Sequence, residues 1–180
     1  MIGVLVSGEG TNLQALLDEG LPIAGVASNR VEARGLARAE AAGIATAVFP
    51  LEAYESRDER DGAMAEWLTA QGVEWVVLAG YMHLLRPSFL DRFPERVINV
   101  HPALLPQFPG AHAIEDALAA GVRETGATVH YVDQGVDTGP VILQERVAVE
   151  DADTVESLRA RIQAVEHRLL PKVVKDLCAR

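Results

Sequence analysis

The sequence predicts an α/β fold: an open, mostly parallel sheet with helices on both faces and an antiparallel hairpin in the C-terminal half. Three observations lead to this prediction. Short apolar runs alternate with helix-like stretches through the first half, which is typical of parallel strands covered by crossover helices. Gly8 and Gly10 follow the first apolar run directly, as at a tight strand-to-helix turn. Later, the turn-rich stretch 133–139 joins two strand-like runs, and so short a connection favours antiparallel pairing.

Strands in the first half are predicted at its five apolar runs, over 2–6, 23–27, 46–49, 75–79 and 97–100. Between them, helices are predicted over 12–19, 33–42 and 56–71. Gly43 and Gly72 follow the second and third of these helices, and glycine is the residue type that most often terminates a helix. The third helix begins with a dense run of charged residues, so we expect its first half to be solvated.

The second half changes character at 101–110, which three prolines and a glycine keep out of regular structure, namely Pro102, Pro106, Pro109 and Gly110. A short helix is predicted over 112–120, and strands over 127–132 and 140–149 form the hairpin.

The last element is the clearest helix of the sequence. Its apolar residues recur at helical spacing, at Val155, Leu158, Ile162, Val165, Leu169 and Val173. Asp153 and Glu156 have the spacing of a capping box, in which two side chains satisfy backbone N–H groups at the helix start. Pro171 is expected to kink the helix.

Composition limits the classes of protein to which the chain can belong. It has 180 residues, of which 49% are hydrophobic and 23% charged, a globular balance that predicts a single domain over 1–180. The net charge of −10 disfavours nucleic acid and anionic membranes as partners. The only cysteine, Cys178, excludes an internal disulfide and a cysteine-based zinc site. With no signal peptide or membrane-spanning apolar run, we expect a cytoplasmic protein.

The glycine loop near the N-terminus, Ser-Gly-Glu-Gly-Thr-Asn over 7–12, follows a strand and opens a helix. Backbone N–H groups in this setting can cradle a phosphate. Leu13 stands where a dinucleotide fingerprint needs its third glycine, and no Walker A lysine follows. Two interpretations remain open: a tight turn with Thr11 as the helix cap, or a sugar-phosphate site in which Thr11 and Asn12 add side-chain donors.

Asn99 and His101 form a polar pair at the carboxyl end of an apolar strand, where open α/β sheets place their active sites. Residues two apart in a strand project to the same side. A buried amide and a cap on the proline-rich segment are the structural alternatives for the two residues. A carboxylate from the 133–139 loop could orient the imidazole, and the spacing does not choose between Asp133 and Asp137.

No nucleophile accompanies these residues, so they suit a reaction in which the substrate supplies its own. Acyl transfer to an amine fits that description. Metal catalysis is disfavoured because no ligand spacing is present among the other histidines, His83, His112, His130 and His167.

Several motifs resemble those of the folate-dependent formyltransferases. The stretch 99–106, Asn-Val-His-Pro-Ala-Leu-Leu-Pro, resembles the family's Asn-x-His-Pro-Ser-Leu-Leu-Pro signature, and 135–142 resembles its second motif. The N-terminal loop, the segment 78–82 and the pair Glu166-His167 are similar to the members that formylate 5'-phosphoribosylglycinamide in purine biosynthesis. The resemblance runs from about residue 2 to about residue 174.

This resemblance implies a single Rossmann-like formyltransferase domain, with a phosphate-binding half over 1–100 and a catalytic loop, hairpin and C-terminal helix over 101–180. It implies that a substrate amine attacks the formyl group of 10-formyltetrahydrofolate. Asn99 and His101 would stabilise the oxyanion, His101 would donate the proton, and Asp137, favoured over Asp133 by the resemblance, would raise the pKa of His101.

The resemblance also implies the binding residues. Phosphoribosylglycinamide would bind at Gly10, Thr11, Asn12 and Glu166. The folate would bind at Arg57, Met82, His83, Leu84, Leu85, Asn99 and Asp133. We expect small molecules as the only partners, no nucleic acid, membrane or metal, and a monomer or homodimer.

The sequence departs from the family pattern at His83, where many relatives carry arginine, at Ile114, which replaces a second histidine, and in ending soon after the final helix. Methionyl-tRNA formyltransferases are expected to be longer and to lack the N-terminal loop, and formyltetrahydrofolate deformylases to carry a preceding regulatory domain. An NAD-linked oxidoreductase and a non-catalytic nucleotide-binding module are further alternatives. Leu13 disfavours the first, and the trio Asn99, His101 and Asp137 disfavours the second.

Overall fold

The computed structural model describes residues 1–179. The chain forms two compact units, Met1–Ile98 and Asn99–Arg180. The single domain predicted over 1–180, with its halves 1–100 and 101–180, stays a prediction. Among the described residues, no helix combines the length and the apolar character that crossing a membrane would require.

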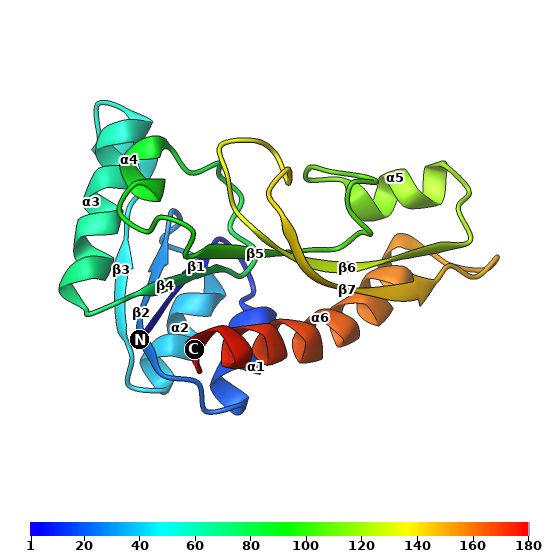
Figure 1. Ribbon diagram of the computed structural model, residues 1–180, viewed down its shortest axis with the longest axis horizontal. Coiled ribbons are helices and arrows are strands. Elements are labelled where there is room, and N and C mark those ends of the chain that lie inside the picture. The colour runs from blue at the N-terminus through cyan, green and yellow to red at the C-terminus, as the bar shows by residue number, and fades with distance from the viewer. Residues whose placement is uncertain (180) are drawn as a thin grey trace. The chain divides into compact units, whose positions relative to one another are not determined.

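The first unit alternates strands and helices along the chain (Figure 1). Its strands are β1 (Ile2–Val6), β2 (Ile23–Ser28), β3 (Ala45–Val48) and β4 (Trp75–Leu78). Its helical elements are α1 (Thr11–Asp18), α2 (Arg34–Ala41), a 3-10 turn η1 (Leu51–Ala53), α3 (Arg57–Ala70) and α4 (Pro87–Leu90). The pairs β1–β2, β1–β4 and β2–β3 are parallel, as predicted. The predicted elements of this unit are confirmed to within one residue at each end, and η1 and α4 are additions to them.

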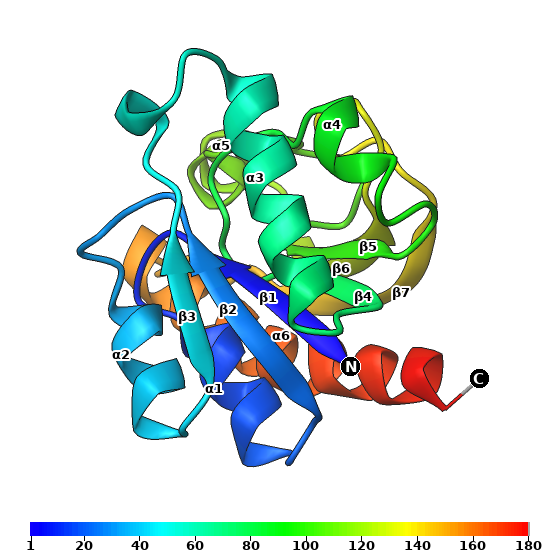
Figure 2. The same ribbon diagram turned by 90° about the vertical axis from the view of Figure 1, so that its left-hand side faces the viewer.

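Glycines allow helices to pack closely against the two faces of β1. A Cβ on Gly3 would lie 2.9 Å from the side chain of Leu68, so this face of β1 packs closely against α3. Val6 projects to the opposite face, where a Cβ on Gly35 of α2 would lie 2.9 Å from its side chain. Helices therefore cover both faces in this unit, with α3 on one face and α1 and α2 on the other (Figure 2).

The first half of α3 differs from the prediction that its charges are solvated. Arg60 and Asp61 are fully buried, with 0% of each residue exposed. Arg60 Nε donates to Asp61 Oδ1 at 2.6 Å, so each buried charge has an opposite charge as its neighbour. The helix begins at Ser56, whose Oγ accepts the Glu59 N–H at 3.1 Å. The prediction of a solvated first half is therefore wrong at Arg60 and Asp61.

In the second unit, a hairpin and a long helix dominate. Strand β5 (Val97–His101) begins at the end of the first unit and continues into the second. The elements that follow are α5 (Ala113–Ala119), β6 (Glu124–Tyr131), β7 (Val141–Ala148) and α6 (Val155–Cys178). β6 and β7 pair antiparallel, which confirms the predicted hairpin, and α6 lies along both strands (Figure 1). The sheet order is β3-β2-β1-β4-β5-β6-β7. The segment predicted to lack regular structure, 101–110, does so over 102–110, whereas His101 ends β5.

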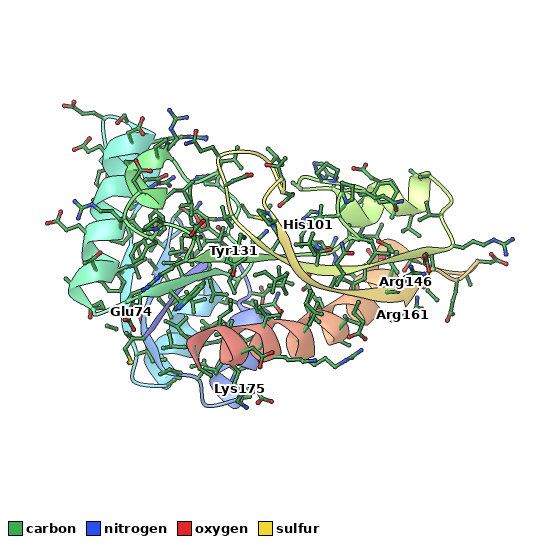
Figure 3. The ribbon with its side chains drawn as sticks, viewed as in Figure 1. Glu74, His101, Tyr131, Arg146, Arg161 and Lys175 are labelled. Atoms are coloured by element: carbon green, nitrogen blue, oxygen red, sulfur yellow. The ribbon has the colours of Figure 1, made fainter. Side chains whose placement is uncertain are left out.

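The cap of α6 is shifted by one residue from the prediction. Thr154 Oγ1 accepts the Ser157 N–H at 3.2 Å, and Ser157 Oγ accepts the Thr154 N–H at 2.9 Å, so these residues form the capping box. Asp153 instead accepts hydrogen bonds from both terminal nitrogens of Arg161, at 2.9 and 3.0 Å. Arg161 also donates to the carbonyl of Ala148, the last residue of β7 (Figure 3). The helix runs on to Cys178 with Pro171 buried inside it.

Candidate active site

The predicted polar pair lies at the end of β5 beside the loop that joins β6 to β7 (Figure 3). His101 is 4% exposed, and its Nδ1 lies 3.3 Å from Asp137 Oδ2. Asn99 projects to the same side, and its Nδ2 lies 3.4 Å from Asp137 Oδ1. The second unit therefore brings together the three side chains that the sequence analysis selected as catalytic.

A second imidazole, His130 of β6, joins this group and was missed by the sequence analysis. It is 2% exposed, and its Nε2 lies 3.2 Å from Asn99 Nδ2 and 3.6 Å from Asp137 Oδ1. Its Nδ1 donates to the Tyr131 carbonyl at 2.7 Å, which fixes the ring. A signal for it exists in the sequence: Thr128 and His130 are polar residues two apart in an apolar strand, the same pattern as Asn99 and His101.

The hydrogen bonds of His101 define the protonation state that fits its surroundings. Nε2 lies 2.7 Å from the Phe108 carbonyl oxygen, which can only accept. Nδ1 faces the Asp137 carboxylate, which as an ion also only accepts. Both acceptors are satisfied together only when both ring nitrogens carry hydrogen. The site therefore suits an imidazolium beside a carboxylate.

Asp137 is held as a carboxylate by its neighbours. Burial by itself raises its pKa, but the neighbouring His130 side chain, the Gly110 N–H and the charge of His101 together bring the pKa below its usual value. Gly110 N donates to Oδ2 at 2.8 Å. The backbone of Asp137 has φ 53°, a left-handed conformation that aspartate tolerates better than most residues.

Asp133 has a different place in the same loop. Its Oδ1 accepts from Thr138 Oγ1 at 2.6 Å and from Gly135 N at 2.9 Å, and these bonds, the Thr138 hydroxyl first, lower its pKa. Gly139 lies against the Tyr131 carbonyl so closely that a Cβ would overlap it. Asp133 thus shapes the loop that carries Asp137, and the geometry puts Asp137, not Asp133, beside the imidazoles.

The glycine loop of the first unit leads from β1 into α1. Gly10, not Thr11, is the N-cap residue, with φ 72°, and no side chain caps the helix within the described chain. The interpretation of Thr11 as the cap is therefore wrong. A Cβ on Gly10 would lie 2.6 Å from Gly35 Cα, and Gly35 N donates to the Gly8 carbonyl at 3.0 Å. The loop is thus held against α2 by contacts that only glycine allows.

The segment 82–85 that the sequence analysis assigned to folate follows β4 and is tied to the glycine loop. Ser7 Oγ accepts the Met82 N–H at 2.9 Å. Met82 and Leu84 are 62% and 48% exposed, whereas Leu85 is buried and His83 is half-buried. Large apolar side chains at this level of exposure suit contact with a flat aromatic ligand.

The remaining predicted binding residues lie on two helices. Arg57 is the first residue of α3 and is exposed. Glu166 is buried on α6, at 6% exposure, next to His167. Burial lowers the pKa of His167, and its Nε2 has no hydrogen-bond partner among residues 1–179. The binding roles of Arg57 and Glu166 stay predictions.

Comparison with known proteins identifies the family. A family profile described as formyl transferase matches residues 1–174. The chain is 41% identical over 180 residues to phosphoribosylglycinamide formyltransferase of Haemophilus influenzae, covering 97% of this chain and 85% of that protein. It is 43% identical to the trifunctional purine biosynthetic protein adenosine-3 of Gallus gallus, again over 97% of this chain but only 18% of that longer protein.

The fold has close counterparts among solved structures. The chain superposes on glycinamide ribonucleotide transformylase 1 from Symbiobacterium toebii with a TM-score of 0.93 and 52% identity, over 95% of this chain and 84% of that one. This agreement confirms the α/β fold with a mostly parallel, Rossmann-like sheet. With the profile spanning nearly all of its length, the chain belongs to the formyl transferase family.

Proposed function

We propose that this protein transfers the formyl group of 10-formyltetrahydrofolate to the terminal amine of 5'-phosphoribosylglycinamide in purine biosynthesis. Family membership and the names of the relatives support the reaction class. The observation that carries the chemistry is the group formed by Asn99, His101 and Asp137, in which a carboxylate faces an imidazole and an amide lies beside it. This group can stabilise an oxyanion and supply a proton, and it contains no side-chain nucleophile.

In the proposed reaction the amine nitrogen attacks the formyl carbon, and the carbonyl electron pair moves onto oxygen as the new C–N bond forms. Asn99 Nδ2–H and protonated His101 stabilise this oxyanion. The tetrahedral intermediate then collapses, breaking the bond to the folate nitrogen, which takes a proton from His101. The proton lost by the attacking nitrogen restores the ring, so the reaction consumes no net proton. Asp137 orients the ring through Nδ1.

The hydrogen bond between His101 Nε2 and the Phe108 carbonyl bears on this proposal. Nδ1 is directed at Asp137, so Nε2–H is the hydrogen that His101 can offer to the substrate. To do so it exchanges the Phe108 carbonyl for the substrate oxygen or the leaving nitrogen. Phe108 itself has φ 53°, a strained conformation for an aromatic residue, in a segment without regular structure.

Binding roles are assigned to residues in both units. The phosphate is proposed to bind at Gly10, Thr11 and Asn12, supported by a helix start that no side chain caps. Glu166 is proposed to hold another part of the same substrate. The folate is proposed to contact Arg57, the segment 82–85, Asn99 and Asp133. No metal takes part in the proposed reaction, and a cytoplasmic monomer or homodimer acting only on small molecules remains our prediction.

The decisive experiment follows formyl transfer from 10-formyltetrahydrofolate by absorbance, with and without phosphoribosylglycinamide. Turnover that requires phosphoribosylglycinamide is the expected result. Turnover without it would replace the proposal with a hydrolase that uses water as the acceptor. A folded sample with no turnover under either condition would contradict the proposed catalytic role of the trio.

A further inference from the structure

A buried polar cluster in the first unit contacts the segment 80–86 that follows β4. Its centre is the guanidinium of Arg60, which is fully buried on α3. Arg60 Nε donates to Asp61 Oδ1 at 2.6 Å, and its Nη1 lies 3.1 Å from His83 Nδ1. Because arginine can only donate, Nδ1 of His83 must be the acceptor, and the ring hydrogen of the neutral imidazole is then on Nε2.

A second donor faces the same ring. Ser7 Oγ accepts the Met82 N–H, so its own hydrogen goes to Asn29 Oδ1, 2.6 Å away. This fixes the orientation of the Asn29 amide, whose Nδ2 lies 3.5 and 3.4 Å from Nδ1 and Nε2 of His83. Two nearly equal distances do not select a tautomer, but a donor at this position opposes a doubly protonated ring. Arg60 is therefore the residue that selects the tautomer.

The net effect of burial and of the neighbouring charges on His83 is in the same direction. Burial comes first among the causes that lower its pKa, followed by the charges of Arg60 and Arg57, whereas the charge of Asp61 opposes them. The Tyr81 ring packs edge-on against His83, with ring centroids 6.0 Å apart. Burial raises the pKa of Tyr81, so it stays neutral. Burial and the two arginines outweigh Asp61, so the pKa of His83 lies below its usual value.

The cluster also fixes the backbone on either side of His83. Asp61 Oδ2 accepts the Arg86 N–H at 2.8 Å, and Ser7 holds Met82 from the other side. Arg60 Nη2 and Tyr81 Oη are buried and have no hydrogen-bond partner among the described residues. Unpaired buried donors are costly, so the group that best completes this cluster is a hydrogen-bond acceptor.

We propose that Arg60 is a positioning residue for the formyl donor: by donating to His83 Nδ1 it keeps that ring neutral with its hydrogen on Nε2, and Nε2–H donates to an acceptor atom of the bound folate. The inference rests on the proposed function, because it assigns the 82–85 segment to the folate. It adds a residue, Arg60, that acts through His83 and need not touch the ligand.

The first test measures the tautomer in the unmodified protein, so it does not depend on a variant that folds. Long-range nitrogen–proton NMR correlations of the histidine rings at pH 7 are expected to show His83 neutral with hydrogen on Nε2. His167 is the internal comparison, since its pKa is lowered by burial alone. A His83 ring that is doubly protonated, or that carries its hydrogen on Nδ1, would overturn the inference.

The second test separates binding of the two substrates. His83→Ala is expected to raise KM for 10-formyltetrahydrofolate about threefold to tenfold, the value of one hydrogen bond, with kcat and KM for phosphoribosylglycinamide unchanged. His83→Gln, which keeps an N–H donor, is expected to restore KM for the folate. Arg60→Lys keeps the charge beside Asp61 but replaces the separate Nε and Nη1 donors by a single nitrogen on a differently shaped side chain. It is expected to raise KM for the folate while the NMR spectrum shows both tautomers of His83.

Arg92→Lys, at an exposed arginine in the same unit, is the matched control and should leave both KM values unchanged. An unchanged KM for the folate in His83→Ala would overturn this inference and leave the proposed function intact. No turnover by the unmodified protein would overturn both together, so the two failures are distinguishable.

Discussion

His101 and His83 are imidazoles in surroundings of opposite character. His101, in the second unit, faces two oxygens that only accept, the Phe108 carbonyl and the Asp137 carboxylate. His83, in the first unit, faces two nitrogens that only donate, Arg60 Nη1 and Asn29 Nδ2. The more deeply buried ring, His101, is the one whose neighbours suit a charged form. Partner chemistry, and not burial alone, therefore distinguishes the two rings: His101 faces acceptors and His83 faces donors.

The role of His101, the ring that faces hydrogen-bond acceptors, is tested by His101→Ala and by Asp137→Asn. Either change removes the imidazolium–carboxylate pair, and kcat is expected to fall about 10²-fold to 10⁴-fold, the usual value of a positioned acid. Steady-state kinetics should show a much smaller change in both KM values. Asp151→Asn, at an exposed carboxylate, is the control, and near-normal turnover in either site variant would contradict the assignment.

The surroundings of His83, the ring that faces hydrogen-bond donors, are tested by Asp61→Asn. This change leaves the guanidinium of Arg60 buried without its counterion. Breaking a fully buried ion pair is expected to lower the free energy of unfolding by about 3 to 5 kcal/mol. Urea denaturation followed by circular dichroism measures this change. Asp91→Asn, an exposed aspartate in the same unit, should have little effect, and an equal loss in both variants would show that the buried pair is not special.

Asn99→Ala tests whether the amide beside Asp137 stabilises the reaction's oxyanion. Removing one such donor is expected to lower kcat about 10²-fold to 10³-fold. Asn99 also bonds to His130, so thermal unfolding of the variant must be measured alongside its kinetics. A rise in KM for the folate with an unchanged kcat would instead make Asn99 a binding residue only.

The smallest expected effect concerns the pH dependence of stability. The pKa of Asp137 lies below its usual 3.8 in the folded protein, so its contribution to stability is fully present above the unfolded value and is lost as pH falls through the folded one. The unmodified protein is therefore expected to lose its stability advantage over Asp137→Asn progressively as the pH falls from 5 to about 3. Thermal melts across this range provide the measurement, and a constant difference would contradict the shifted pKa.

Much of the fold could be predicted from the sequence because local patterns determine it. Apolar runs bounded by glycine and proline placed the strands of the first unit, and Asn99 and His101 stood out because polar residues interrupt a buried strand. The same reasoning missed His130, although Thr128 and His130 repeat this pattern in the next strand, because the histidines were searched only for metal-ligand spacing. It also missed the Phe108 carbonyl and the Gly110 N–H, because every residue carries these groups and only the folded chain selects them.

Patterns of charged residues predicted the structure less well than patterns of apolar residues did. Arg60 and Asp61 stand in a run of charged residues that resembles a solvated helix face, and only tertiary packing shows that this pair is buried. At the start of α6, Asp153 and Glu156 matched a capping pattern, but Thr154 and Ser157 form the cap because Arg161 engages Asp153. In the first place tertiary packing overrides the local pattern, and in the second an ion pair to a residue eight positions along the chain does so.

The close approach of Gly10 to Gly35 couples two positions that are far apart in the sequence. A side chain at 10 would strike Gly35 Cα, and a side chain at 35 would strike Val6. In a saturation mutagenesis library, both positions should therefore tolerate almost no substitution, although Gly35 lies outside the proposed phosphate loop. Intolerance at 35 would then reflect packing against the Val6 side chain, and a screen that equates intolerance with catalysis would misassign it.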